Sequence, residues 1–299
     1  MGKLYAALVI LSLIWGTSFL FIKVLVNDFG PWGVVFWRSF FGALTLLLIL
    51  FLRKEKQKWD DLPWLSIILV GILNNVLPWG LIALSETKIS SSMASVVNAT
   101  TPIWTILIGF LIFSNKLRKM QWLGIFIGFI GILILLNLNI KQLLSENLLG
   151  VGTMIGATIC YGFGTQLSKR YLKDLSITFI SASTLFVAAV TSFFMMLVVN
   201  PEAIAAIVSV KVILYLIGLG VFGSGFAYLF FYYMVKEGSP EFAALVTYLV
   251  PVSAMLWGKL LLGEVISINM LIGLVFIFSG VYLSSYKRKS KQVTSKIVA

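Results

Sequence analysis

The chain has 299 residues, of which 60% are hydrophobic and 11% are charged. Soluble domains carry charge on about a quarter of their residues, so this composition excludes a water-soluble globular protein and indicates an integral membrane protein. The formal net charge is +12, and the positions of the basic residues decide whether this excess points to nucleic acid or to a membrane.

Ten apolar runs follow one another along the chain. A helix that crosses a bilayer needs about 20 mostly apolar residues, and charged clusters and turn residues divide the sequence into segments of about this length. We therefore expect an all-α integral membrane protein with ten transmembrane helices, over residues 3–26, 31–52, 63–85, 90–114, 118–137, 147–169, 176–199, 211–236, 239–262 and 266–286. The connections between the runs are short. The first run is too long for a cleaved signal peptide, so we expect the first helix to be retained.

The basic residues are divided unevenly between the two sides of the predicted bundle. With the N-terminus in the cytoplasm, most of the 23 Lys and Arg residues fall in cytoplasmic segments, whereas the opposite connections hold Lys88, Lys141 and Lys211. This is the positive-inside asymmetry of membrane proteins. The sequence therefore predicts a multi-pass plasma-membrane protein with both termini in the cytoplasm. Its partner is the lipid bilayer, and the basic excess gives no reason to expect nucleic acid.

The two halves of the chain resemble each other. One shift of the sequence against itself aligns Pro102 with Pro251, Gly109 with Gly258, Gly124 with Gly273 and Gly131 with Gly280. A slightly different shift aligns Lys23 with Lys169 and Asp28 with Asp174. A change in loop length is enough to explain the difference between the two shifts.

This similarity predicts two five-helix repeats. We expect the first repeat over residues 1–138, the second over residues 147–287, and a basic cytoplasmic tail over residues 288–299. Because five is an odd number, the second repeat enters the membrane from the opposite side, so the repeats are inverted. Inverted repeats are typical of secondary transporters, in which one part rocks against another to give alternating access to a central site.

Prolines interrupt matching helices of the two predicted repeats. Pro102 and Pro251 each lie near the middle of a helix, where a proline frees the carbonyl four residues earlier, here that of Asn98 or Thr247. Pro78 is placed similarly in the third helix. Broken helices at matching positions mark binding sites in such transporters, so we expect helix breaks at these three prolines. The alternative is a tolerated kink, because proline is common in membrane helices.

Two cationic residues lie inside predicted helices. Lys23 is close to the end of the first helix, where it either reaches the membrane surface as an anchor or attracts anions at the outer mouth of a cavity. Arg38 lies deeper, and a charge at the bilayer centre costs about 2.5–3.5 kcal/mol on insertion scales. Arg38 therefore either serves a cavity or forms a structural pair. These positive charges favour a substrate with a carboxylate or another anionic group.

Acidic residues give no comparable signal. The 11 Asp and Glu residues fall in predicted loops or near helix ends, and there is no histidine, so the sequence predicts no proton relay at the bilayer centre. Proton coupling through Glu241 or Glu264 stays open, although Glu264 also suits an interfacial pair with Lys259. No set of residues suggests a metal site or a cofactor.

The other candidate substrate-binding residues are polar or aromatic. Aromatic side chains with polar tips suit a small amphipathic ligand, although each also suits the core or the membrane interface. With Lys23, Arg38, Asn98 and Thr247, the candidates are Trp15, Phe19, Asn75, Trp79, Thr101, Gln166, Tyr228, Tyr232 and Tyr248.

Three other functions compete with a metabolite exporter. An intramembrane enzyme would need metal ligands, a nucleophile with its base, or paired acids within the bilayer, and none is apparent. A multidrug or organic-cation proton antiporter would favour a buried acid, whereas the buried charges predicted here are cationic. Inverted repeats also build channels, and only transport kinetics separate a channel from a carrier.

The whole chain resembles the EamA-type family of the drug/metabolite transporter superfamily. The resemblance rests on Trp15-Gly16, on the two buried cations and paired prolines described above, and on Leu262-Gly263-Glu264 before the last helix, followed by Gly273 and Gly280. It implies ten-helix carriers that export small metabolites, including amino acids and their derivatives, from the bacterial cytoplasm, and a monomer is sufficient for this. The first half departs from the family pattern, because Asn115 stands where an acidic residue is usual.

Overall fold

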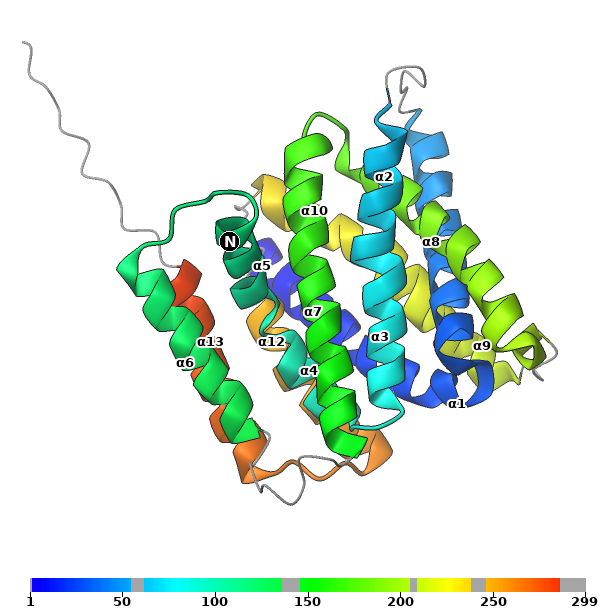
Figure 1. Ribbon diagram of the computed structural model, residues 1–299. Helices are drawn as coiled ribbons and strands as arrows, with labels where there is room; N and C mark the ends of the chain where they lie inside the picture. The colour runs from blue at the N-terminus through cyan, green and yellow to red at the C-terminus, as the bar shows by residue number, and fades with distance from the viewer. Residues whose placement is uncertain (1, 55–61, 136–145, 205–208, 238–245, 286–299) are drawn as a thin grey trace, which may run out of the picture.

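The computed structural model describes residues 2–54, 62–135, 146–204, 209–237 and 246–285. Within these ranges all regular secondary structure is helical, and the helices form a single bundle (Figure 1). The all-α prediction is therefore confirmed for the described part of the chain. The tail 288–299 and the connection that contains Glu241 lie outside these ranges.

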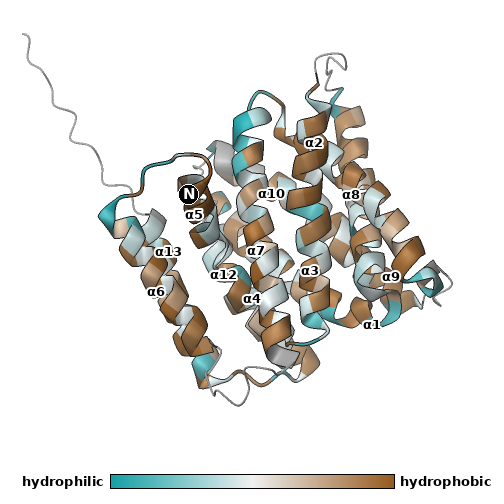
Figure 2. Cartoon of the chain, viewed as in Figure 1, coloured by the Kyte–Doolittle hydropathy of each residue, from teal (hydrophilic) through white to brown (hydrophobic). Residues whose placement is uncertain are grey.

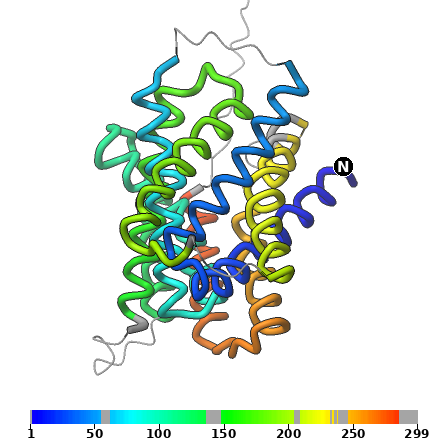
Figure 3. The backbone as a smooth tube through the Cα atoms, turned by 90° about the vertical axis from the view of Figure 1, so that its right-hand side faces the viewer, coloured from blue at the N-terminus to red at the C-terminus, as the bar shows by residue number. Residues whose placement is uncertain are grey.

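Helix α1, Gly2–Arg53, contains both of the first two predicted helices. Its backbone leaves the helical conformation at Gly30, with φ of 63° and ψ of 173°, immediately before Pro31. This positive φ favours glycine, and a Cβ atom at Gly30 would also lie within 2.8 Å of the Asn200 side chain. In Figure 3, α1 turns back at its bend, so its two halves behave as two helices.

The remaining helices occur in the expected order. Their bounds are α2 Trp64–Gly71, η2 Ile72–Val76, α3 Leu77–Glu86, α4 Ser91–Asn98, α5 Thr101–Leu111, α6 Lys119–Leu135, α7 Glu146–Tyr171, α8 Ile177–Val199, η4 Pro201–Ile204, α9 Val210–Ile217, η5 Gly218–Phe226, α10 Ala227–Glu237, α12 Val246–Leu262 and α13 Ile268–Ser285. The elements η2 and η5 are π-helical, and each joins two α-helices into one longer apolar segment.

Length and composition qualify six of the described helical segments to cross a membrane. They are Gly2–Arg53, Trp64–Glu86, Ser91–Leu111, Leu148–Tyr171, Ile177–Val199 and Val210–Phe231. Three shorter apolar helices accompany them, over Lys119–Leu135, Val246–Leu262 and Ile268–Ser284. Large apolar side chains such as Phe51, Leu65 and Val198 are exposed on the outside of the bundle, where hydrophobic residues are widespread (Figure 2). This surface suits lipid rather than water.

The three prolines expected to break helices have different effects. Pro102 lies in the first turn of α5, and helical structure is interrupted between α4 and α5. Pro78 lies in the first turn of α3, directly after π-helical η2. In contrast, α12 continues through Pro251 without a break, so the expectation is wrong there. A proline removes one backbone hydrogen bond, and packing against neighbouring helices can hold a membrane helix together around it.

Helices α6 and α13 pack with their backbones in close contact (Figure 1, left). A Cβ atom on Gly131 would lie 2.9 Å from the Gly273 carbonyl oxygen, and a Cβ on Gly280 would lie 2.6 Å from the Gly124 carbonyl oxygen. The earlier glycine of one helix thus meets the later glycine of the other, so the pair is antiparallel. Small residues allow membrane helices to approach this closely.

We predict that Gly124→Leu destabilises this helix pair. The larger side chain would overlap the backbone of α13, and such overpacking costs about 1–3 kcal/mol. Thermal unfolding in detergent should show a lower midpoint for this variant. Gly152→Leu is the matched control, because a Cβ atom at Gly152 meets no atom within 4 Å. Equal midpoints for the two variants would contradict the packing account.

Candidate functional site

A cavity of about 600 Å³ lies inside the bundle. Its lining comes from the two halves of α1, from η2 and α3, from α4 and α5, and from α7, η5, α10 and α12. Both halves of the chain therefore contribute to one space, which lies within the usual size range of a small-molecule site.

Most of the predicted binding residues line this cavity. They are Trp15, Phe19, Arg38, Trp79, Asn98, Thr101, Tyr228 and Thr247, together with Pro251. The cavity lining does not include Lys23, Asn75, Gln166, Tyr248, Pro78 or Pro102. The side chain of Tyr232 lies outside the described part of the structure.

The residues outside the lining have other contacts. The Gln166 side-chain amide donates a hydrogen bond to the Thr105 carbonyl on α5, at 3.0 Å. The Tyr248 ring packs edge-on against Phe278, with 5.1 Å between the ring centroids. These two side chains join helices rather than facing the cavity.

The asparagine that faces the cavity is Asn74, not Asn75 as predicted. Asn75 is 2% exposed and is not itself part of the lining, but its side chain forms a hydrogen bond with Tyr228, which is. Both residues belong to π-helical η2, whose wider turns rotate side chains relative to an α-helix. Regular helical spacing therefore does not identify Asn74 as a lining residue. The nearby Pro78 was the only sequence signal that the helix is irregular.

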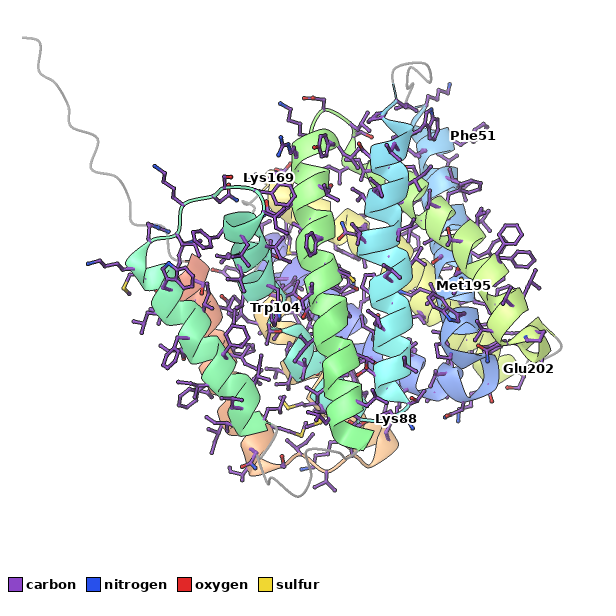
Figure 4. All side chains as sticks on the ribbon, viewed as in Figure 1. Phe51, Lys88, Trp104, Lys169, Met195 and Glu202 are labelled. Carbon is purple, nitrogen blue, oxygen red and sulfur yellow. The ribbon has the colours of Figure 1, made fainter. Side chains whose placement is uncertain are left out.

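The cavity opens at one end of the bundle and is closed at the other. Thr165 and Lys169 belong to the lining and are exposed, so the cavity reaches the surface beside the last turns of α7. At the other extreme, the lining residues Ile22 and Ile82 are only 2% and 3% exposed. Figure 4 shows Lys169 and Lys88 toward opposite ends of the molecule. We call the Lys169 end the mouth and the Lys88 end the gate.

Arg38 provides a fixed positive charge in the cavity wall. Its side chain is 8% exposed, and its Nε atom donates a hydrogen bond to the Ser224 hydroxyl at 2.9 Å. The guanidinium carbon lies 3.9 Å from the centroid of the Trp79 ring, a distance typical of a cation–π contact. These contacts with η5 and α3 hold the charge in place.

Two side-chain acceptors in the lining lack protein donors. The Oδ1 atoms of Asn74 and Asn98 are buried and make no hydrogen bond, and both residues line the cavity. Buried polar atoms without a partner are rare and costly. The cavity wall therefore combines a cation with two asparagines whose Oδ1 atoms lack a protein donor.

Aromatic rings form much of the remaining wall. Trp15 packs against Phe231, with 5.9 Å between the ring centroids, and its indole N–H donates to the Gly223 carbonyl at 3.2 Å. This hydrogen bond joins Trp15, in the first half of the chain, to Gly223, in the second half, and fixes the orientation of the ring. The rings leave an apolar surface beside the polar groups, which suits an amphipathic ligand.

Lys23 closes the gate instead of lining the cavity. Its ammonium group donates hydrogen bonds to the carbonyl oxygens of Glu86 and Ile89, the second at 2.9 Å. The Glu86 carbonyl lies at the C-terminal end of α3 and the Ile89 carbonyl three residues beyond it. A cation at this end satisfies free acceptors and complements the helix dipole. Lys23 thereby joins α1 to α3, a contact that the sequence did not predict.

Glu264 makes a second connection at the gate. Its carboxylate accepts hydrogen bonds from the backbone N–H groups of Ser91 and Ser92, at 2.8 and 3.0 Å, and from both serine hydroxyls. The N-terminus of α4 is thus held by the segment that follows α12, as expected for a carboxylate at a helix N-terminus. An interfacial pair with Lys259 is not the role of Glu264.

The repeat counterpart of Glu264 forms the same backbone turn without the charge. The Glu264 N–H donates to the Gly258 carbonyl at 3.1 Å, and the Asn115 N–H donates to the Gly109 carbonyl at 3.0 Å. Asn115 is exposed. The departure from the family pattern therefore leaves the turn intact and removes a carboxylate at this position.

Comparison with known proteins agrees with this architecture. The model of the EamA-like transporter family matches residues 2–137 and 148–286. A crystal structure matches this chain with a TM-score of 0.64 and 16% sequence identity. The match covers 95% of this chain and 97% of the chain in the crystal structure, and it supports the fold alone.

Curated relatives match over nearly their full length. An uncharacterized inner membrane transporter of Escherichia coli, YedA, is 30% identical over 99% of this chain and 95% of its own. An uncharacterized transporter of Bacillus subtilis, YoaV, is 25% identical over 98% of this chain and 100% of its own. These matches confirm the resemblance expected from the sequence, and the chain belongs to the EamA-like transporter family.

Proposed function

We propose that the protein exports small amphipathic metabolites with an anionic group, such as amino acids or their derivatives, by alternating access. In this proposal ten membrane helices form two inverted repeats, both termini are cytoplasmic, and the mouth faces the cytoplasm. The observation that carries the proposal is a charged, aromatic cavity that both halves of the chain line and that, among the described residues, is exposed at Thr165 and Lys169.

Two features support the inverted repeats. In the α6–α13 pair, Gly124 meets Gly280 and Gly131 meets Gly273. The sequence shift instead aligns Gly124 with Gly273 and Gly131 with Gly280. Each contact therefore joins one residue of one aligned pair to one residue of the other. Such reciprocal contacts are characteristic of a two-fold axis. In addition, the shift that aligns Lys23 with Lys169 also aligns the first residues of the π-helical elements η2 and η5.

The polar groups of the cavity support a zwitterionic substrate. The Arg38 guanidinium can bind a carboxylate with two parallel hydrogen bonds. The Oδ1 atoms of Asn74 and Asn98 can accept hydrogen bonds from an ammonium or amine group. An apolar side chain would then contact rings such as Trp15 and Phe231. A quaternary cation would instead bring like charge toward Arg38 in a site of low dielectric constant.

Counterflow into proteoliposomes tests this function. We predict that vesicles loaded with an unlabelled mixture of amino acids take up a labelled amino-acid mixture in a saturable way. Organic anions and quaternary ammonium cations should be tested in parallel, because their relative transport reports the charge that the cavity selects.

The results separate the competing functions. Saturable exchange of amino acids that exceeds exchange of the cations would support the proposal. Exchange of cations alone would indicate an organic-cation carrier, and flux without saturation or exchange would indicate a channel. Either result would contradict the proposed function.

Arg38→Gln should remove the preference for a carboxylate. Hydrogen bonds to charged groups contribute about 1.5–3 kcal/mol, so we expect roughly a 10- to 100-fold loss of competition by leucine in counterflow. Competition by leucinamide, which lacks the carboxylate, should change little. Arg170→Gln is the control, because Arg170 is exposed and does not line the cavity. An equal loss for both compounds would indicate that Arg38 has only a structural role.

A further inference from the structure

Glu86 is a buried acid that the transport site does not use. It is the last residue of α3 and is 0% exposed. Both carboxyl oxygens are buried without a hydrogen-bond partner. The sequence placed this residue near a helix end, where acids usually reach water. In the structure, α1 near Lys23, α4 and the first turns of α7 pack against α3 in this region.

The neighbouring polar contacts leave the Glu86 carboxyl group unpaired. Lys23 donates to the backbone carbonyl of Glu86, not to its carboxyl group. On α7, the Gly150 carbonyl accepts a hydrogen bond from the Ser85 hydroxyl at 2.7 Å. On α4, the N-terminal serines are held by Glu264. These neighbouring donors are therefore occupied elsewhere.

The charges that act on Glu86 come from two other elements. Lys23 and Arg38 on α1 supply positive charge, and Glu264 after α12 supplies negative charge. Helix α4 contains no charged residue. The charged side chains described on α7, Lys169 and Arg170, lie at its opposite end. Lys23 is thus the cation that can reach the end of α3 most directly.

An ionised Glu86 would compete for the ammonium group of Lys23. A hydrogen bond between two charged groups is stronger than one from an ammonium to a carbonyl, and an unpaired buried carboxylate is very costly. Loss of the Glu86 proton would therefore draw Lys23 away from the carbonyls of Glu86 and Ile89. Lys23 would then stay joined to α3 through the carboxylate, but its hydrogen bond to Ile89, in the segment between α3 and α4, would be lost.

We propose that Glu86 is a proton-binding site that controls the gate. With a proton on Glu86, Lys23 binds the end of α3 and the gate is closed, as in this structure. When Glu86 gives its proton to water at the gate, Lys23 pairs with the carboxylate and releases the Ile89 carbonyl, and the gate opens at this segment. This inference concerns the gate of the proposed transporter, but proton binding at Glu86 can be tested without a transported substrate.

Thiol labelling in lipid nanodiscs measures gate opening from both faces of the membrane. Ile89→Cys, in a Cys160→Ser background, places a thiol at a gate position that is 4% exposed. We expect a maleimide to label it faster at alkaline pH than at acid pH, relative to Glu202→Cys at an exposed site. The ionised fraction of an acid changes roughly tenfold per pH unit below its titration midpoint, so the effect should be large.

Two substitutions should remove this pH dependence with opposite results. Glu86→Gln keeps a neutral side chain, so labelling should stay slow at every pH. Lys23→Gln removes the connection, so labelling should stay fast at every pH. Lys211→Gln, which changes an exposed lysine, should behave like the parent protein. Because all variants carry the same cysteine, thiol chemistry alone cannot produce these differences.

Infrared spectroscopy of the purified protein provides an independent test. The parent protein should show the carbonyl band of a protonated carboxylic acid, which Glu86→Gln removes and Glu202→Gln retains. The proposal would be overturned if Glu86→Gln kept either the band or the pH-dependent labelling of the parent. These readouts require no transport, so they can fail while counterflow succeeds, or succeed while counterflow fails.

Discussion

The hydrogen bonds from Lys23 to the end of α3 are the contact on which the shape of the cavity depends. They join the first half of α1 to α3 at the gate, where a cation replaces the missing acceptor partners of a helix C-terminus. The cavity floor at Ile22 and Ile82 is closed beside this contact. At the mouth, Thr165 and Lys169 of the lining are exposed, so the cavity is open there.

A water-free environment explains why these ties are made by charged groups. Within a membrane, each backbone donor or acceptor must find a partner in the protein, and the free ends of α3 and α4 meet at the gate. Lys23 satisfies the carbonyls of α3, and Glu264 satisfies the N–H groups of α4. The two residues have opposite charge because the two helix ends have opposite dipoles.

The sequence predicted the fold class, the family and much of the cavity lining, because these depend on apolar length, repeat spacing and short motifs. It failed where tertiary contacts decide the outcome. The π-helical turn of η2 brought Asn74 rather than Asn75 to the cavity. Glu86 is the last residue of α3, yet neighbouring helices bury it completely. Packing also kept α12 continuous at Pro251.

The central claim is that the gate and the mouth open alternately. Distances between spin labels at Thr87 and Val265 would report the gate, and distances between labels at Arg170 and Glu237 would report the mouth; all four positions are exposed. With transported substrate in lipid nanodiscs, the account predicts a population in which the gate distance increases and the mouth distance decreases. Distances that remain fixed, or that increase together at both ends, would contradict it.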